Sequence, residues 1–198
     1  MWLRELKALF LERIDVALFY LRVGLPRLFK CDVFHDNHYN QECRRGRQLC
    51  AHDERHILYE LITQDYFDSA HFLADYHGKC ENLHGHRWKV EVTIGAEGLQ
   101  GAGTERDMVC DFGEFKRIVR DTVTQFDHTF LVEEGTLSAP TISALEGEGF
   151  SITLLPFRTT AENIAKHFFD TLTSKGLNVV QVEVDETPNN RAVYRKDR

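Results

Sequence analysis

Potential metal-binding chemistry is concentrated in the seven residues from Cys80 to His86, where His84 and His86 flank a single glycine. A third imidazole, His71, lies thirteen residues before His84. Neutral imidazole nitrogens suit Zn²⁺, and three protein ligands leave a fourth position open for water or substrate, as in catalytic zinc sites. His71, His84 and His86 are therefore the candidate ligands of a zinc ion.

The role of Cys80 has three interpretations from the sequence. It is a fourth ligand that closes the zinc site, a reactive thiol beside an open site, or a buried apolar residue, which is the commonest role of a cysteine without a disulfide. Lys79 and a nearby metal ion both favour the thiolate, which accepts protons from carbon or oxygen. Cys110 has no activating neighbour in the sequence, and we predict that it belongs to the core.

The spacing of the histidines predicts how the backbone presents them. His84 and His86 differ by two positions, so both point to the same face of an extended chain. Gly85, between them, would let the backbone approach a bound ion closely. Residues 88–94 alternate apolar and polar side chains, which predicts a half-buried antiparallel strand fed by the His84–His86 loop. A second strand within residues 57–73 would deliver His71.

Two further groups have both a chemical and an ordinary interpretation. Asp127 and His128 are either a helix-end cap with a surface imidazole, or a carboxylate that orients a proton-shuttling imidazole. Glu186 ends a predicted strand and precedes Thr187. It is either a solvated carboxylate or a group that grips a guanidine-like edge through two parallel hydrogen bonds.

The remaining pattern predicts two helices, a loop and three short strands. Asp111 is a good N-cap for a helix whose buried stripe is Phe112, Phe115, Ile118, Val119 and Val123. Thr159 and Glu162 form a capping box for a second helix to about Ser174, with Ile164, Phe168 and Leu172 facing inward. Residues 133–149 are predicted to be a flexible surface loop, and short strands are predicted at 151–155, 179–184 and 192–194.

The first 56 residues are predicted to be an extension of a domain that spans residues 57–198. Residues 1–25 have the periodicity of an amphipathic helix. Residues 30–56 have no clear periodicity but are rich in cysteine and histidine and contain a basic cluster at 44–47. This segment is either a second metal site or a polar linker, although its spacing matches no zinc-finger pattern.

Bulk composition excludes several classes of protein. The net charge of −7 argues against a nucleic-acid-binding protein. Five irregularly spaced cysteines do not form a disulfide framework and fit the reducing cytoplasm. Charged residues interrupt the apolar N-terminus before a secretory h-region forms, and the uncharged run at 16–21 is too short to cross a bilayer.

Together these motifs resemble the 6-pyruvoyl-tetrahydropterin synthase family, and within it the bacterial 6-carboxytetrahydropterin synthases of queuosine biosynthesis. The specific signal is Cys-x-x-x-His-Gly-His with an upstream Ala-His. Supporting motifs follow in family order: 108–112, 126–128, 160–163 and 186–190. The resemblance covers about residues 60 to 195. Family members typically begin a few residues before the first strand, so residues 1–56 are a regulatory helix, an interface element, or sequence upstream of the natural start.

The resemblance implies an α+β architecture, the tunnelling fold (T-fold), with a four-stranded antiparallel sheet and two helices on one face. It also implies a homohexamer, a dimer of trimers with active sites between subunits. His71, His84 and His86 would bind zinc, Cys80 would be the catalytic thiol assisted by Asp127 and His128, and Glu186 with Thr187 would anchor the pterin ring.

The activity implied is that of a zinc-dependent lyase. It would convert 7,8-dihydroneopterin triphosphate to 6-carboxy-5,6,7,8-tetrahydropterin, releasing triphosphate and acetaldehyde. Two alternatives remain open. The sister activity, 6-pyruvoyl-tetrahydropterin synthesis, uses the same ligands, and a non-catalytic zinc protein would use Cys80 to complete a closed Cys-His₃ site. A weaker hypothesis is that the basic cluster at 44–47 binds RNA. One short basic cluster on an acidic chain is little evidence for this.

Overall fold

The computed structural model describes residues 57–195. The predicted helix at 1–25, the cysteine- and histidine-rich segment and the basic cluster at 44–47 lie outside the described residues, as do residues 196–198.

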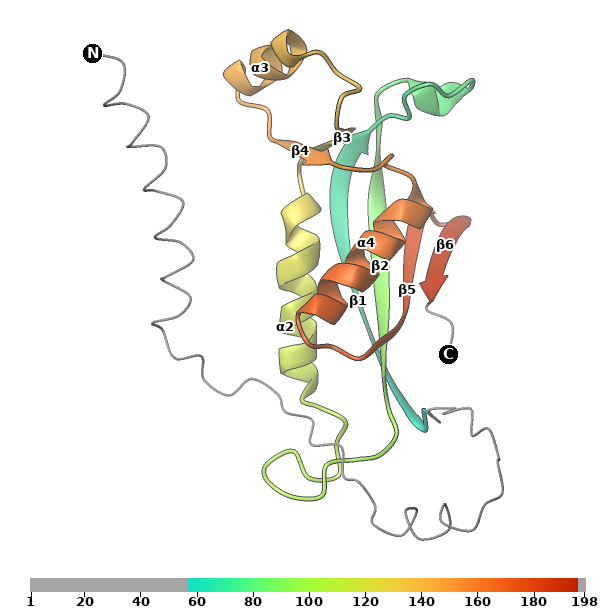
Figure 1. Ribbon diagram of the computed structural model, residues 1–198, viewed down its shortest axis with the longest axis vertical. Coiled ribbons are helices and arrows are strands. Elements are labelled where there is room, and N and C mark those ends of the chain that lie inside the picture. Colours follow the sequence, from blue (N-terminus) through green and yellow to red (C-terminus); the bar gives the residue numbers. More distant parts are fainter. Residues whose placement is uncertain (1–56, 196–198) are drawn as a thin grey trace, which may run out of the picture. The chain divides into compact units, whose positions relative to one another are not determined.

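The described chain forms one mixed sheet of six strands in the order β4-β3-β1-β2-β5-β6 (Figure 1). The predicted antiparallel set is present as four neighbouring strands: β1 (Tyr59–His71), β2 (His84–Ala96), β5 (Val179–Thr187) and β6 (Asn190–Arg195). Two short strands, β3 (Phe130–Glu133) and β4 (Ile152–Leu155), extend the β1 edge in parallel. The count of four strands implied by the resemblance was therefore too low. The short strand predicted at 151–155 is present as β4, whereas β3 was not predicted, because four residues carry too little alternation to indicate a strand.

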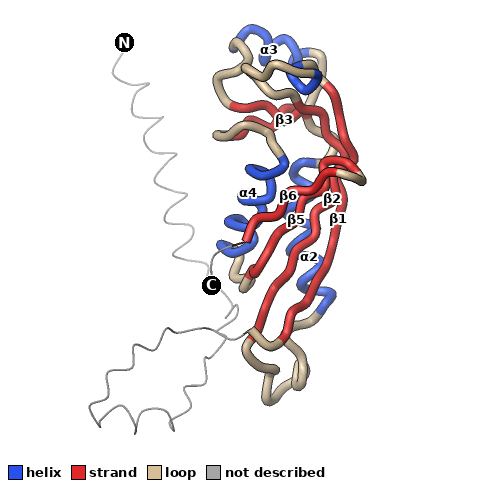
Figure 2. Tube along the Cα trace, turned by 90° about the vertical axis from the view of Figure 1, so that its right-hand side faces the viewer, coloured by secondary structure: helices blue, strands red, loops and turns tan. Residues whose placement is uncertain are grey.

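The β1–β2 hairpin is the longest pairing in the sheet (Figure 2). It has thirteen residue pairs, from Tyr59 opposite Ala96 to His71 opposite His84. β2 begins at His84, four residues before the predicted strand. The histidines therefore belong to the strand itself, not to a loop that feeds it.

Two helices cover one face of the sheet, as predicted (Figure 1). α2 (Phe112–Val123) begins at Asp111, whose Oδ1 accepts a hydrogen bond from the Glu114 N–H at 3.0 Å. Phe115, Val119 and Val123 are buried, whereas Phe112 is 49% exposed and was wrongly included in the predicted stripe. Phe112 is the first residue of the helix, so it lies at the end of the stripe that the other three continue.

α4 (Ala161–Ser174) packs on β5 and β6 with Ile164, Phe168 and Leu172 fully buried, which confirms the predicted face. Its cap is Thr160, whose Oγ1 accepts from the Asn163 N–H at 3.4 Å, and not Thr159 as predicted. Thr159 is completely buried and bonds to the end of β1 instead. The capping box was misplaced by one residue because two consecutive threonines offer the same hydroxyl.

A third helix occupies the segment that was predicted to be a flexible loop. α3 (Ala139–Gly147) begins at Ser138, whose side chain accepts from the Thr141 N–H, and it has proline in its first turn. None of its residues is buried, so it shows no strong apolar stripe that the sequence could have revealed. No helix within residues 57–195 is long and apolar enough to span a membrane.

His167, a residue of α4, packs against three aromatic rings. It stacks on Phe126 at 5.4 Å between ring centroids and contacts Phe157 and Phe168. Burial lowers the pKa of His167 below its ordinary 6.5, and Asp170 opposes this shift more weakly. The folded state therefore favours the neutral ring.

We expect this ring to make the fold sensitive to acid. Below pH 6.5 the unfolded chain binds a proton at His167 that the folded chain resists, so stability present above pH 6.5 is lost as the pH falls toward the lower folded-state pKa. His167→Phe should reduce the loss of stability between pH 7 and pH 5. Urea unfolding of both proteins at the two pH values measures the difference, and equal losses would contradict the prediction.

Candidate metal centre

The register of the β1–β2 hairpin brings the three histidines to one face. His71 lies directly opposite His84, and Ser69 lies opposite His86. Two pairs further along, Phe67 lies opposite Trp88, and both are fully buried with rings stacked at 5.7 Å. The histidines thus continue the apolar face of the hairpin, the face whose buried side chains form the core, and the indole of Trp88 packs edge-on against His71 and His86.

The three imidazoles present their Nε2 atoms to one another. The ligand atoms of the cluster all lie within 4.8 Å of each other, and the ring centroids are 4.5 to 5.3 Å apart. Each Nε2 is buried and has no hydrogen-bond partner within residues 57–195. Buried polar atoms are normally paired, so three unpaired nitrogens that converge fit a site for a metal ion.

Backbone carbonyls define which nitrogen faces the cluster. His71 Nδ1 lies 2.9 Å from the Thr159 carbonyl oxygen, and His84 Nδ1 lies 2.7 Å from that of Asn82. A carbonyl only accepts, so each Nδ1 carries the proton and donates it, which leaves the Nε2 lone pair for a metal. These outer contacts are the kind that orient histidine ligands in metal sites.

Burial also favours the neutral form that binds metal. The pKa of His71 is lowered from 6.5 to about 4, mainly by loss of solvent and to a smaller extent by the two neighbouring histidines, while the bond to Thr159 opposes the shift. Burial likewise lowers the pKa of His86, while Glu186 acts in the opposite direction. Burial thus favours the neutral form of His71 and His86, the form that metal ligation requires.

Glu186 faces the cluster from β5. Its Oε1 lies 3.7 Å from His71 Nε2 and 3.9 Å from His86 Nε2. The pairing of β5 with β6 shifts register between Asp185 and Thr187, and such irregularities re-aim side chains. Thr187 follows at the turn into β6, where its Oγ1 accepts from the Asn189 N–H at 3.4 Å. A molecule held by Glu186 would therefore lie beside the histidines.

Cys80 lies on the loop between β1 and β2, within a short 3₁₀ helix, Lys79–Glu81. Its carbonyl accepts from the Leu73 N–H at 2.8 Å, which closes the loop at its base. The side chain is partly buried. The cluster of converging ligand atoms found within residues 57–195 contains the three histidines without this sulfur. Cys110 is partly buried and packs against the core, as predicted.

Asp127 and His128 form a close pair beside β1, on the edge that pairs with β3 and not on the edge that pairs with β2. The His128 Nδ1 lies 2.9 Å from Asp127 Oδ2, which raises the pKa of His128 and contributes to lowering that of Asp127. Asp127 Oδ1 accepts from the Asp68 N–H at 2.8 Å, the larger cause of its lowered pKa, and the His128 N–H donates to the Asp68 carbonyl at 2.7 Å. His128 adopts a positive φ of 55° in this arrangement.

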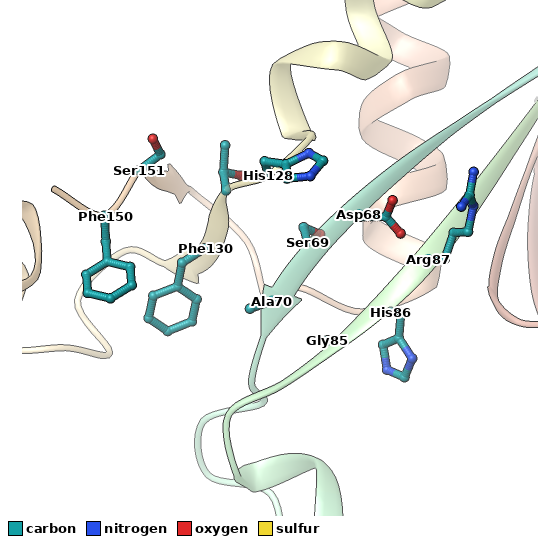
Figure 3. Close-up of a pocket in the computed structure, with 11 residues that line it drawn as sticks. Asp68, Ser69, Ala70, Gly85, His86, Arg87, His128, Phe130, Phe150 and Ser151 are labelled. Carbon is teal, nitrogen blue, oxygen red and sulfur yellow. The ribbon is translucent and has the colours of Figure 1, made fainter.

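His128 of this pair borders a cavity of about 530 Å³ (Figure 3). Its lining includes His128, Asp68, Arg87, Phe130 and Phe150. Asp68 and Arg87 alternate with Ser69 and His86 along their strands, so their side chains lie on the other face of the sheet from the histidine cluster. His86 also borders the cavity, but its ring points away from His128 (Figure 3). Within residues 57–195 no hydrogen bond or ion pair joins the Asp127–His128 pair to the histidine cluster.

The structure changes the interpretation of Gly85. A Cβ at this position would lie 3.2 Å from the Ser69 carbonyl oxygen, on the face away from the three histidines. The glycine thus permits a close approach between the two strands. The prediction that it lets the backbone approach a bound ion was wrong, because residues 84 and 86 face the cluster and residue 85 alternates with them.

Comparison with known proteins identifies the family. The model of the 6-pyruvoyl tetrahydropterin synthase family matches residues 60–197. The chain belongs to this family. A relative from Haemophilus influenzae, named 6-carboxy-5,6,7,8-tetrahydropterin synthase, is 34% identical over 142 residues, covering 70% of this chain and 100% of the relative. A protein of the same name from Aquifex aeolicus is 33% identical over 129 residues, covering 60% of this chain and 77% of the relative. The resemblance derived from the motifs is thus confirmed.

Two solved structures share the fold of this chain. The 6-pyruvoyl tetrahydropterin synthase of Plasmodium vivax aligns with a TM-score of 0.52 at 22% identity, covering 70% of this chain and 98% of the other. A protein from Wolinella succinogenes aligns with a TM-score of 0.57, also at 22% identity and with the same coverage. These neighbours support the predicted T-fold.

Proposed function

We propose that the chain is a zinc-dependent 6-carboxytetrahydropterin synthase, a lyase of queuosine biosynthesis in the cytoplasm. The observation that carries the metal site is the convergence of three buried, unpaired Nε2 atoms from His71, His84 and His86. Relatives that bear the name 6-carboxy-5,6,7,8-tetrahydropterin synthase, and that the chain covers over most of their length, support this activity.

The proposed reaction converts 7,8-dihydroneopterin triphosphate and water to 6-carboxy-5,6,7,8-tetrahydropterin, triphosphate and acetaldehyde. The carbon–oxygen bond to triphosphate breaks, and so does the bond between the first and second side-chain carbons. The first carbon becomes the carboxyl group, and the other two leave as acetaldehyde. Two electrons pass from the side chain to the dihydropterin ring, so the reaction balances without an external reductant.

The residues divide this work. Zn²⁺ held by the three histidines would polarise the side-chain hydroxyls and acidify the adjacent C–H bond. Cys80, as thiolate, removes a proton at that carbon. His128, oriented through its Nδ1 by Asp127, exchanges protons at its Nε2. Glu186 holds the amino-pyrimidine edge of the ring through two hydrogen bonds, with Thr187 beside it.

This division of work requires more than one copy of the chain. In one copy the Asp127–His128 pair is held by the backbone of Asp68, and no hydrogen bond or ion pair within residues 57–195 joins the pair to the histidine cluster. A second copy that presents its own pair to the histidine face would complete the site. We therefore propose a homo-oligomer, a hexamer built as a dimer of trimers, with active sites between subunits.

Product analysis tests the activity. The zinc-loaded protein is incubated with dihydroneopterin triphosphate, and the products are identified by mass spectrometry. Acetaldehyde with a 6-carboxy product supports the proposal. A three-carbon diketo product without acetaldehyde would instead identify 6-pyruvoyl-tetrahydropterin synthesis, and an unchanged substrate would favour a non-catalytic zinc protein.

Glu186→Gln should weaken substrate capture while leaving the metal bound. The amide keeps the size of the carboxylate but loses one acceptor and the charge that strengthens both hydrogen bonds. We expect kcat/KM to fall about ten- to a hundred-fold, the effect of losing a charge-assisted hydrogen bond. Steady-state kinetics and zinc content measure this. Glu146→Gln on α3 is the matched control, and an unchanged kcat/KM for Glu186→Gln would remove Glu186 from the site.

A further inference from the structure

Residues 158 and 159, which precede α4, tie this helix to the end of β1. The Thr159 carbonyl accepts from His71 Nδ1 at 2.9 Å, and the Thr159 hydroxyl donates to the Phe72 carbonyl at 3.1 Å. Thr159 is completely buried. One residue thus fixes both the ring of a metal ligand and the backbone that follows it.

Arg158 extends the same connection into the loop that carries Cys80. Its Nη2 donates to the Ala74 carbonyl, and its guanidinium lies 5.8 Å from the ring centroid of Tyr76. The Arg158 carbonyl accepts from Asn163 Nδ2 at 2.9 Å, so the residue is itself held by the first turn of α4. Its side chain therefore links a rigid helix to the β1–β2 loop.

The point of attachment lies beside the bond that closes the loop. The Leu73 N–H donates to the Cys80 carbonyl at 2.8 Å, and Ala74, the next residue, accepts from Arg158. Any movement of Ala74 is thus passed through Leu73 to the backbone of Cys80. The 3₁₀ helix in this loop contains no buried residue, so packing of this helix into the core does not anchor the loop.

The charge of Arg158 is not used in an ion pair. No carboxylate of residues 57–195 lies within 4.0 Å of its guanidinium, whereas Arg117, Arg120 and Arg191 each have such a partner. Its Nε is buried and unpaired. Hydrogen bonds from a charged donor to a carbonyl are stronger than neutral ones, so the charge serves the bond to Ala74.

We propose that Arg158 is a positioning residue that holds the Cys80 loop in register with the histidine cluster. The sequence gives Arg158 no such role, because it lies 78 residues after Cys80 and matches none of the motifs. The effect on catalysis rests on the proposed function of Cys80, whereas the effect on the loop does not.

The test uses the full-length, zinc-loaded protein and the variants Arg158→Met and Arg158→Lys. Hydrogen exchange is followed in peptides from residues 72–83 and 112–123, together with zinc content, kcat and KM. Arg158→Met should speed exchange in 72–83 about ten-fold, the effect of one lost charge-assisted hydrogen bond, and leave 112–123 unchanged. Zinc content should hold, kcat should fall about ten-fold, and KM should stay within about two-fold.

Arg158→Lys keeps one charged donor and should recover part of the protection and of kcat. Arg106→Met is the matched control, since that exposed arginine pairs only with its neighbour Asp107 among the ion pairs of the described chain. If Arg158→Met fails to fold, Tyr76→Leu removes the ring from the same guanidinium at an exposed position and should speed exchange in 72–83 to a smaller extent.

Unchanged exchange in 72–83 in all three site variants would overturn the proposal. A rise in KM with unchanged kcat and exchange would also overturn it, and would make Arg158 a group that binds the anionic triphosphate instead. If the wild-type protein does not turn over dihydroneopterin triphosphate, the proposed function fails, while exchange and zinc content still decide the role of Arg158.

Discussion

Replacing Cys80 by alanine is expected to leave the metal bound and to slow turnover strongly. Three histidines already converge without the sulfur, so the loss of Cys80 removes none of the atoms in the cluster. The proposed thiolate is a proton-transfer group, and such groups contribute about a hundred- to ten-thousand-fold to rate. We therefore expect kcat to fall within that range with zinc content unchanged.

Metal analysis and single-turnover kinetics on the same preparation separate the possible roles of this residue. Cys110→Ala is the matched control, because that cysteine packs against the core and has no proposed chemistry. Loss of zinc in Cys80→Ala would establish a closed Cys-His₃ site and remove the open coordination position. Retained zinc with full turnover would show that the reaction does not use the thiol.

Replacing His84 by alanine is expected to remove the metal. His84 is less buried than His71, so its loss disturbs the core less and isolates the effect on ligation. Mutation of an outer partner of a metal ligand typically costs ten- to a hundred-fold in metal affinity, and loss of a ligand itself should exceed about a hundred-fold. Turnover should fall in parallel.

Competition with a chromophoric zinc chelator measures the affinity directly. Added zinc should also raise the Tm of the wild-type protein, because a ligand that binds only the folded state stabilises it, and should not raise that of His84→Ala. His77→Ala is the control, an exposed histidine on the loop between β1 and β2. If His84→Ala binds zinc as tightly as the wild type, the three-histidine assignment is wrong.

The sequence predicted the parts of the site that depend on short-range spacing. His84 and His86 share a face because a strand alternates with period two, and this holds wherever the strand begins. The cap at Asp111 and the buried face of α4 were equally visible, since both depend on residues within a few positions of one another. The sequence predicted that the strand of His71 pairs with the strand after His86. It did not predict the register that places His71 opposite His84.

Features set by distant contacts could not be predicted. In the sequence Thr159 has the features of a helix cap. Its carbonyl contacts the ring of His71, which lies 88 residues earlier, and a contact over that separation leaves no local pattern. β3 pairs with β1 through Ala70 and Phe130, a contact that no local pattern encodes. The Asp127–His128 pair was expected to assist Cys80. Its position is determined by hydrogen bonds to Asp68 of β1, next to the pairing of β1 with β3, and the sequence does not reveal these contacts.

Because His71 and His84 lie directly opposite each other, metal binding depends on the register of β1 against β2. If β2 slipped by one residue along β1, its side chains would exchange faces, and His84 and His86 would turn away from His71. Only the native alignment gathers all three nitrogens, so a bound ion stabilises that alignment and none of the slipped ones. If the proposed zinc binds here, zinc supply during synthesis would thus influence how often the hairpin forms in the native register, before any substrate is present.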